Sequence, residues 1–139
     1  NALLAGEMSG HMFFNDRYFG FDDAIYSSLR FLEIIGKEQK SLDKIISFIP
    51  KMFNTPEIRI DCADEKKFEV VESLKREIKK LKYKFLDIDG VRIQFSDGGF
   101  GLVRASNTQP VLVMRFEAKT EKLLNHHKNF VMDLLKKFI

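Results

Sequence analysis

Residues 104–110, with the sequence RASNTQP, carry side chains of the kind that bind phosphate groups. The apolar runs 100–103 and 111–116 flank them, so the pattern predicts a tight loop joining two strands. Arg104 offers a planar fork of donors that fits a phosphate bidentately. Ser106, Asn107 and Thr108 add hydroxyl and amide groups. Because the same residue types are common in ordinary turns, a phosphate site and a plain hairpin turn both stay open.

A second polar stretch, residues 6–11, reads GEMSGH. Its two glycines predict a loop between two short strands. Glu7 accepts hydrogen bonds, Ser9 donates and accepts them, and His11 can also carry a proton near neutral pH. This mixture suits the hydroxyl groups of a polyol. One carboxylate and one imidazole are too few ligands for a metal ion, and a plain polar loop with a structural histidine is the alternative.

The other histidine, cysteine and basic residues are expected to have structural roles. Adjacent positions on a helix point about 100° apart, so His126 and His127 cannot chelate together, and one of them is expected to pack partly in the core. Cys62 is expected to be a buried or half-buried small hydrophobe. A basic run could touch nucleic acid, but interleaved glutamates at helical spacing predict a solvated, ion-paired face. The run comprises Lys66, Lys67, Lys75, Arg76, Lys79, Lys80 and Lys82.

Hydrophobic periodicity predicts a first part of the chain, residues 1–50, with two helices. One is expected to start at the acidic pair 22–23, to end before Gly36, and to carry an apolar stripe made by Ile25, Leu29, Leu32 and Ile35. The other is expected between Ser41 and Pro50. Prolines bracket the next residues, so 51–56 are predicted to be a linker and a hinge.

Residues 57–139 predict a separate α+β domain. Strands are expected at 58–60, 85–88, 91–95, 100–103 and 111–116, with a hairpin turn at Asp89-Gly90. A helix over 64–82 and a second one capped by Thr120 would cover one apolar face of an antiparallel sheet. The residues expected on the buried face of the first helix are Phe68, Val71, Leu74, Ile78 and Leu81, and those of the second are Leu123, His127, Phe130, Val131, Leu134 and Phe138.

Composition supports a packed protein with a modest charge. The 139 residues are 45% hydrophobic and include 14 Phe, enough for a substantial core. A net charge of +3 does not by itself require a nucleic acid or a membrane. The single cysteine excludes a disulfide framework within this sequence and fits a cytoplasmic location. Asn1-Ala2 is expected to be the remnant of a cleaved tag on a fragment of a longer protein.

Taken together, the two polar stretches resemble the α-D-phosphohexomutase superfamily. GEMSGH is similar to its sugar-binding loop, and GLVRASNTQP at 101–110 is similar to its C-terminal phosphate-binding loop. Residues 15–26, NDRYFGFDDAIY, resemble the segment that follows the sugar loop in the bacterial phosphomannomutase/phosphoglucomutase branch. Amino-sugar mutases tend to have Gln in place of Met8 and Gly in place of Asn107, so the chain follows the manno/gluco pattern.

The resemblance implies a four-domain enzyme that moves a phosphoryl group between O1 and O6 of a hexose phosphate through a bisphosphate intermediate. It implies a phosphoserine in the first domain and Mg²⁺ on an Asp-rich loop in the second. Neither loop is found in this sequence, so the chain is expected to be the end of domain 3 plus domain 4, inactive alone and without a metal site. The implied C-terminal fold is a four-stranded antiparallel sheet with two helices, like the TATA-box-binding protein, after a mostly helical remnant of an α/β domain.

The resemblance also implies residue roles. Glu7 and Ser9 would bind the sugar 3- and 4-hydroxyls, and His11 would be a possible accessory to catalysis. The phosphate that is not transferred would be held by Arg104, Ser106, Asn107 and Thr108. The implied partners are mannose or glucose 1-/6-phosphate and the missing N-terminal domains, not nucleic acid or membrane. A stand-alone anion- or nucleic-acid-binding module is the alternative, favoured by the basic helix and a pI of about 9.0.

Overall fold

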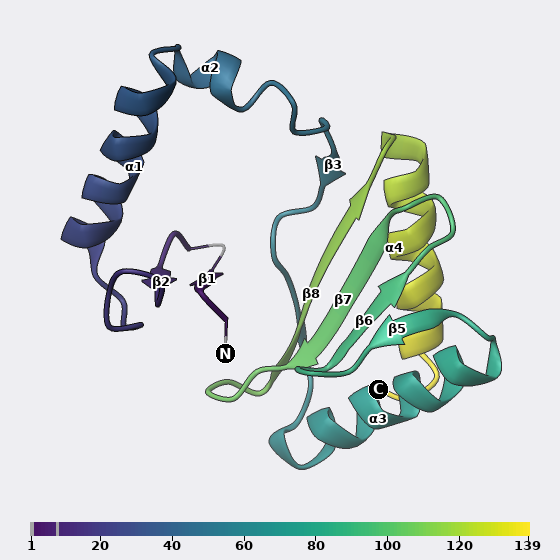
Figure 1. Ribbon diagram of the computed structural model, residues 1–139. Coiled ribbons are helices and arrows are strands. Elements are labelled where there is room, and N and C mark those ends of the chain that lie inside the picture. Colours follow the sequence, from purple (N-terminus) through teal and green to yellow (C-terminus); the bar gives the residue numbers. More distant parts are fainter. Residues whose placement is uncertain (1, 8) are drawn as a thin grey trace. The chain divides into compact units, whose positions relative to one another are not determined.

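A computed structural model describes residues 2–7 and 9–139 and divides the chain into two compact units, Asn1–Pro50 and Lys51–Ile139 (Figure 1). Met8, one of the two positions that indicated the manno/gluco branch, and Asn1 of the expected tag remnant lie outside the described residues.

The first unit contains a short hairpin and two helices. Strands β1 (Leu4–Gly6) and β2 (Met12–Phe14) pair antiparallel. Helix α1 (Ala24–Glu38) begins after Asp23, whose carboxylate accepts the Tyr26 N–H at 2.9 Å, as the acidic pair predicted. The expected end at Gly36 is wrong, because the helix continues through this glycine to Glu38 and is capped by Gln39 with φ +50°. Helix α2 (Leu42–Ile45) is shorter than predicted.

The apolar face predicted for α1 is exposed. Ile25 is 78% exposed, and Leu29 and Leu32 are also exposed. In the described part of the chain no residue of α1 is buried. These side chains form the apolar stripe that the sequence predicted, and nothing in the described unit covers it. The mostly helical character of this unit is as expected.

The second unit is a sheet with two helices against one of its faces (Figure 1). The elements are β3 (Phe53–Asn54), β4 (Ile58–Asp61), α3 (Asp64–Lys80), β5 (Lys84–Leu86), β6 (Val91–Gln94), β7 (Phe100–Ala105), β8 (Val111–Ala118) and α4 (Glu121–Leu135). The strand order is β3-β8-β7-β6-β5, with β4 also beside β8, and every pairing is antiparallel. The predicted α+β class and antiparallel sheet are confirmed.

The sheet has six strands rather than the four that the resemblance implied. The additional ones are short strands at the edges. Strand β3 lies in the segment 51–56 that was predicted to be a linker, and Asn54 pairs with Glu117. The buried Thr55 accepts the Phe116 N–H at 3.1 Å through Oγ1. Pro56, which has no N–H to donate, separates β3 from β4 along the same neighbour. A hinge in this segment stays a prediction.

The core lies between the sheet and its helices, and it corrects the predicted face of α3. The buried residues of α3 are Lys67, Val70, Val71, Leu74 and Ile78, whereas Phe68 is 56% exposed and Leu81 is exposed. The buried stripe is therefore displaced around the helix from the one predicted, and it includes a lysine. On α4, Thr120 caps the helix and His127 is buried, as predicted. Cys62 is also buried, and this burial raises the pKa of its thiol.

Candidate functional site

Residues 104–110, called the arginine loop below, form the connection between β7 and β8. Arg104 pairs with Val113 across the two strands, and the Ser106 N–H donates to the Val111 carbonyl at 3.0 Å to close the loop. The Pro110 carbonyl accepts the Cys62 N–H at 2.8 Å, which ties the loop to the segment after β4. The predicted tight loop between two strands is confirmed.

Ser106 organises this loop from inside. Its side chain is buried, and its Oγ accepts the N–H groups of Thr108 at 3.3 Å and Gln109 at 3.2 Å. The lone pairs of this hydroxyl are therefore used within the loop, and only its proton is left to donate to a ligand. Asn107 and Thr108 are exposed, so their side chains are accessible to an anion.

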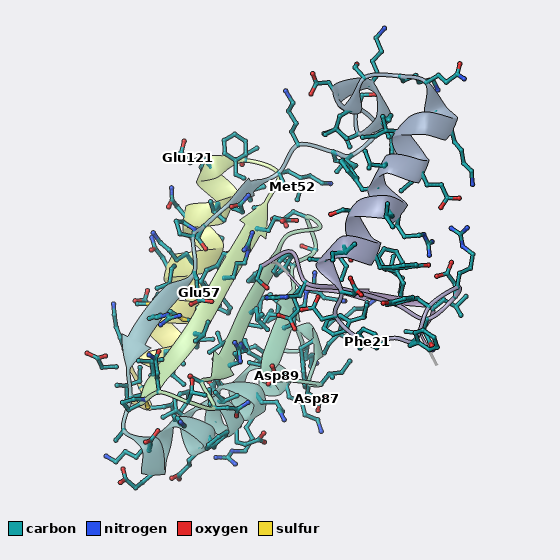
Figure 2. All side chains as sticks on the ribbon, turned by 90° about the vertical axis from the view of Figure 1, so that its left-hand side faces the viewer. Phe21, Met52, Glu57, Asp87, Asp89 and Glu121 are labelled. Carbon is teal, nitrogen blue, oxygen red and sulfur yellow. The ribbon has the colours of Figure 1, made fainter. Side chains whose placement is uncertain are left out.

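The Arg104 side chain stands on the face of the sheet opposite the helices. It is 34% exposed, and its Nη1 lies 3.8 Å from Oδ2 of Asp89, which is labelled in Figure 2 at the turn between β5 and β6. This separation exceeds that of a hydrogen bond. The Asp89 carboxylate therefore does not occupy the N–H donors of the Arg104 guanidinium. These donors can bind an external anion.

Residues 6–11, called the sugar loop below, connect β1 and β2 in the first unit. The Glu7 N–H donates to the His11 carbonyl at 2.9 Å, and the Gly10 N–H donates to the Glu7 carbonyl at 3.0 Å. Gly10 has φ +93°, which a residue with a side chain rarely adopts. The exposed Ser9 Oγ donates to Glu7 Oε2 at 3.2 Å. The loop thus brings a carboxylate and a hydroxyl together at the surface.

His11 has an acidic partner that the sequence did not reveal. Its Nδ1 lies 2.6 Å from Oδ2 of Asp22, a residue expected only to help cap α1. A carboxylate on Nδ1 fixes a proton there and leaves Nε2 to face a ligand. The pairing joins the sugar loop to the segment that begins α1, through the bridge between Phe13 and Asp22. The two partners are eleven positions apart in the sequence, so neither helical nor strand periodicity predicts the contact.

Ion pairs fix the segment between β2 and α1. Arg17 reaches Glu33 of α1 at 2.7 Å, and Arg30 reaches Asp16 at 2.7 Å. The Arg30 hydrogen bond lowers the pKa of Asp16 to about 2, and the Arg17 hydrogen bond lowers that of Glu33 to about 2. Both carboxylates are therefore ionised at neutral pH, and the two ion pairs hold the segment before α1 against the helix.

The described residues do not provide a site for the Mg²⁺ that the resemblance implies. Within 2–7 and 9–139, no group of three or more His, Cys, Asp and Glu side chains could hold a metal ion. No role for Mg²⁺ is therefore assigned to these residues. None of the helices in the described residues is long and apolar enough to cross a membrane.

Comparison with protein families identifies two domains in the chain. Residues 57–134 match the family model for the phosphoglucomutase/phosphomannomutase C-terminal domain, and residues 1–52 match that for the alpha/beta/alpha domain III of the same proteins. The chain belongs to this family. The sugar loop lies within the domain III match and the arginine loop within the C-terminal domain match.

Individual relatives agree with the family match. The chain is 48% identical over 135 residues to a phosphomannomutase/phosphoglucomutase of Pseudomonas aeruginosa, covering 97% of this chain and 29% of that protein. It is 43% identical to a phosphoglucomutase of Neisseria gonorrhoeae, covering 92% and 28%. A solved phosphoglucomutase/phosphomannomutase family protein from Burkholderia thailandensis superposes with a TM-score of 0.80 at 37% identity, covering 98% and 28%. The chain thus spans less than a third of the length of these relatives.

Lys67 lies in the phosphoglucomutase/phosphomannomutase C-terminal domain, and the prediction of a solvated basic face is wrong for this residue. It is 4% exposed and donates to the Gln109 carbonyl of the arginine loop. The spacing of positions 67, 71, 74 and 78 is the signal that could have placed it on the buried face. The rest of the basic run agrees better with prediction, since Lys75 pairs with Glu72 at 2.7 Å and Lys80 with Glu77 at 3.4 Å.

Proposed function

We propose that this chain supplies two substrate-recognition loops of a phosphomannomutase/phosphoglucomutase. The reaction is the transfer of a phosphoryl group between O1 and O6 of a hexose phosphate through a bisphosphorylated intermediate. The observation that carries the proposal is the Arg104 guanidinium, which is accessible beside a loop whose Asn107 and Thr108 side chains are exposed. Because relatives carry both names, mannose and glucose phosphates are both proposed as substrates.

The arginine loop is proposed to hold the phosphate that is not being transferred. Arg104 would bind it bidentately, Asn107 and Thr108 would donate to it, and Ser106 would shape the loop and offer its proton. These groups position the substrate and do not react with it. Phosphoryl transfer depends mainly on in-line placement and charge stabilisation, so binding energy from the remote phosphate can be used to orient the reacting end.

The sugar loop is proposed to bind hydroxyl groups of the hexose. Glu7 would accept from the 3- or 4-hydroxyl and Ser9 would donate to or accept from its neighbour, with the existing Ser9–Glu7 hydrogen bond holding both side chains ready. These two hydroxyls keep their positions when the sugar is turned end for end, so one loop can serve both orientations. His11, oriented by Asp22, would position the substrate or handle a proton near it.

The phosphoserine and Mg²⁺ of the reaction are proposed to come from parts of the enzyme other than the residues described here. The chain by itself is therefore expected to bind sugar phosphates without converting them. The segment 51–56 is proposed to let residues 57–139 move when substrate binds.

Kinetics of the full-length enzyme test the proposal. Arg104→Ala should reduce kcat/KM, mainly through a higher KM, because it removes a charge-assisted bidentate contact. The reduction should correspond to a loss of about 2–4 kcal/mol in transition-state stabilisation. Arg92→Ala is the matched control, since Arg92 stands on the neighbouring strand β6 with its guanidinium 4.0 Å from the Phe100 ring centre. An Arg104→Ala enzyme with the same kcat/KM as the parent would refute the phosphate-binding role.

A further inference from the structure

The ammonium group of Lys67 lies beneath the arginine loop and not in solvent. The residue is 4% exposed, and its Nζ donates to the Gln109 carbonyl at 3.1 Å and to Asp64 Oδ1 at 2.6 Å. The Phe68 ring centre lies 5.4 Å from the same nitrogen. Removing a lysine ammonium from water is costly unless hydrogen-bonding partners compensate it. Its two oxygen partners therefore account for a charge buried at this position.

The Gln109 carbonyl oxygen accepts hydrogen bonds that fix the conformation of the loop. It accepts the Lys67 ammonium and also the Val111 N–H at 2.8 Å. The next residue is Pro110, so the peptide that follows Gln109 has no N–H with which to fix its orientation. On its other side, the Gln109 N–H is held by Ser106 Oγ at 3.2 Å. Lys67 and Ser106 thus fix the two peptide groups of Gln109.

We propose that Lys67 is a positioning residue of the arginine loop, which anchors the Gln109 carbonyl so that Asn107 and Thr108 are presented to a phosphate. The anchoring follows from the contacts of Lys67, whereas the identity of the ligand rests on the proposed function. A charged donor suits this role because hydrogen bonds from an ammonium are stronger than those from a neutral group. Lys67 does not contact the phosphate in this account.

A purely structural role for the Lys67–Asp64 pair makes a different prediction. The Asp64 side chain is 65% exposed, so water can solvate its carboxylate when the Lys67 ammonium is removed, and no buried charge is left unpaired. Lys67→Met keeps a long unbranched side chain and removes the ammonium. If Lys67 acts on the loop, this variant should remain folded while the loop loses its order and its affinity for phosphate. Lys66, which is exposed on the same helix, provides the matched control Lys66→Met with the same change in net charge.

Nuclear magnetic resonance of the 139-residue chain tests the proposal with two readouts. The first, without ligand, is amide hydrogen exchange at Thr108 and Gln109. The second is the Kd for inorganic phosphate and for glucose 1-phosphate. In Lys67→Met, exchange at both amides should accelerate and the Kd should rise about tenfold, the effect of losing one charge-assisted hydrogen bond. Lys67→Arg should recover part of both, and Lys66→Met should behave like the parent.

Unchanged amide exchange in Lys67→Met would overturn the anchoring, whatever the phosphate affinity. If amide exchange accelerates in Lys67→Met but the parent chain binds neither probe, the anchoring is supported and phosphate binding by this chain is refuted. The anchoring and the proposed function can therefore fail separately. If Lys67→Met does not fold, Lys67→Gln gives the same readouts with a neutral donor. An exchange rate equal to that of the parent in Lys67→Gln would then overturn the need for an ammonium.

Discussion

Gly90 lies directly beneath Arg104. A Cβ atom at position 90 would come within 2.7 Å of the Arg104 Cβ and within 2.3 Å of the Val103 carbonyl oxygen. Gly90 also has φ +79°, a conformation that residues with a side chain rarely adopt. The Asp89-Gly90 turn therefore does more than reverse the chain between β5 and β6. It leaves the space in which the backbone of Arg104 rests.

Substitution of Gly90 should disturb Arg104 as well as stability. Gly90→Ala is expected to cost about 1–3 kcal/mol in the free energy of unfolding, from backbone strain alone, and to weaken phosphate binding by displacing Arg104. Urea denaturation and a phosphate titration measure the two effects. Gly36→Ala is the control, because Gly36 lies inside α1 with nothing near its missing Cβ, and alanine there should be neutral or stabilising. A stable Gly90→Ala chain with normal phosphate affinity would contradict this account.

The orientation of His11 by Asp22 can be tested by removing one charge. In the full-length enzyme Asp22→Asn should lower kcat/KM by about tenfold, because the imidazole loses the partner that fixes its tautomer. Both side chains are largely exposed, so the stability should change by less than about 0.5 kcal/mol. Imidazole ¹⁵N shifts should report a mixture of tautomers in the variant and an Nδ1-protonated ring in the parent. Asp43→Asn in α2 should change none of these quantities, and a normal kcat/KM for Asp22→Asn would remove His11 orientation from the mechanism.

Asp97 and His127 form a pair that should make stability depend on pH. Asp97 Oδ2 lies 2.8 Å from Nε2 of His127, which is buried and stacks on Phe95. Burial raises the pKa of Asp97, but the Gly99 N–H and the His127 ring together lower it by more, so its pKa lies below the usual value. A carboxylate with a lowered folded-state pKa stabilises the fold above its unfolded pKa of about 3.9, and this contribution is lost as pH falls through the folded value.

Asp97→Asn should therefore lower the free energy of unfolding by about 1–3 kcal/mol at pH 7 and by much less near pH 3. Urea unfolding at the two pH values measures the difference. Asp133→Asn is a suitable control, because Asp133 and its partner Lys136 are both well exposed and their pair contributes little. An equal loss of stability for Asp97→Asn at both pH values would show that the carboxylate charge does not stabilise the fold.

Phosphate binding by this chain should not depend on a metal ion. The described residues offer no cluster of metal ligands, so EDTA or added Mg²⁺ should leave the Kd for inorganic phosphate unchanged. The same chain should show no conversion of glucose 1-phosphate to glucose 6-phosphate in a coupled assay. Turnover by the purified chain, or loss of phosphate binding in EDTA, would mean that the roles assigned to these residues are wrong.

Local patterns in the sequence predicted most of the second unit. Alternating residues predicted β4 and β6, and apolar runs predicted β7 and β8. The Asp89-Gly90 pair predicted a hairpin, and Thr120 predicted the start of α4. The strand β3 was missed because two prolines around 51–56 are typical of a linker, whereas Thr55 joins the sheet through a hydrogen bond to Phe116. The face of α3 was misplaced because a lysine at position 67 was read as a solvated residue.

The two loops of the candidate site could be proposed from the sequence, but the contacts that support these loops could not. Residue types alone indicated Arg104–Thr108 and Glu7–His11, and the resemblance to the family gave them roles. The contacts of Lys67 with Gln109, of Asp22 with His11 and of Gly90 with Arg104 join segments 42, 11 and 14 residues apart. Such contacts depend on how the hairpins and helices pack, and this packing cannot be predicted from local sequence periodicity.

Titration of the 139-residue chain with glucose 1-phosphate, followed by ¹H–¹⁵N resonances, tests the central claim most directly. The account predicts saturable shifts of the Asn107 and Thr108 amides and of the Arg104 side-chain Nε–H, with an affinity that falls at least tenfold in Arg104→Ala and stays normal in Arg92→Ala. The absence of saturable shifts in the arginine loop, or equal affinities for the parent and Arg104→Ala, would contradict it.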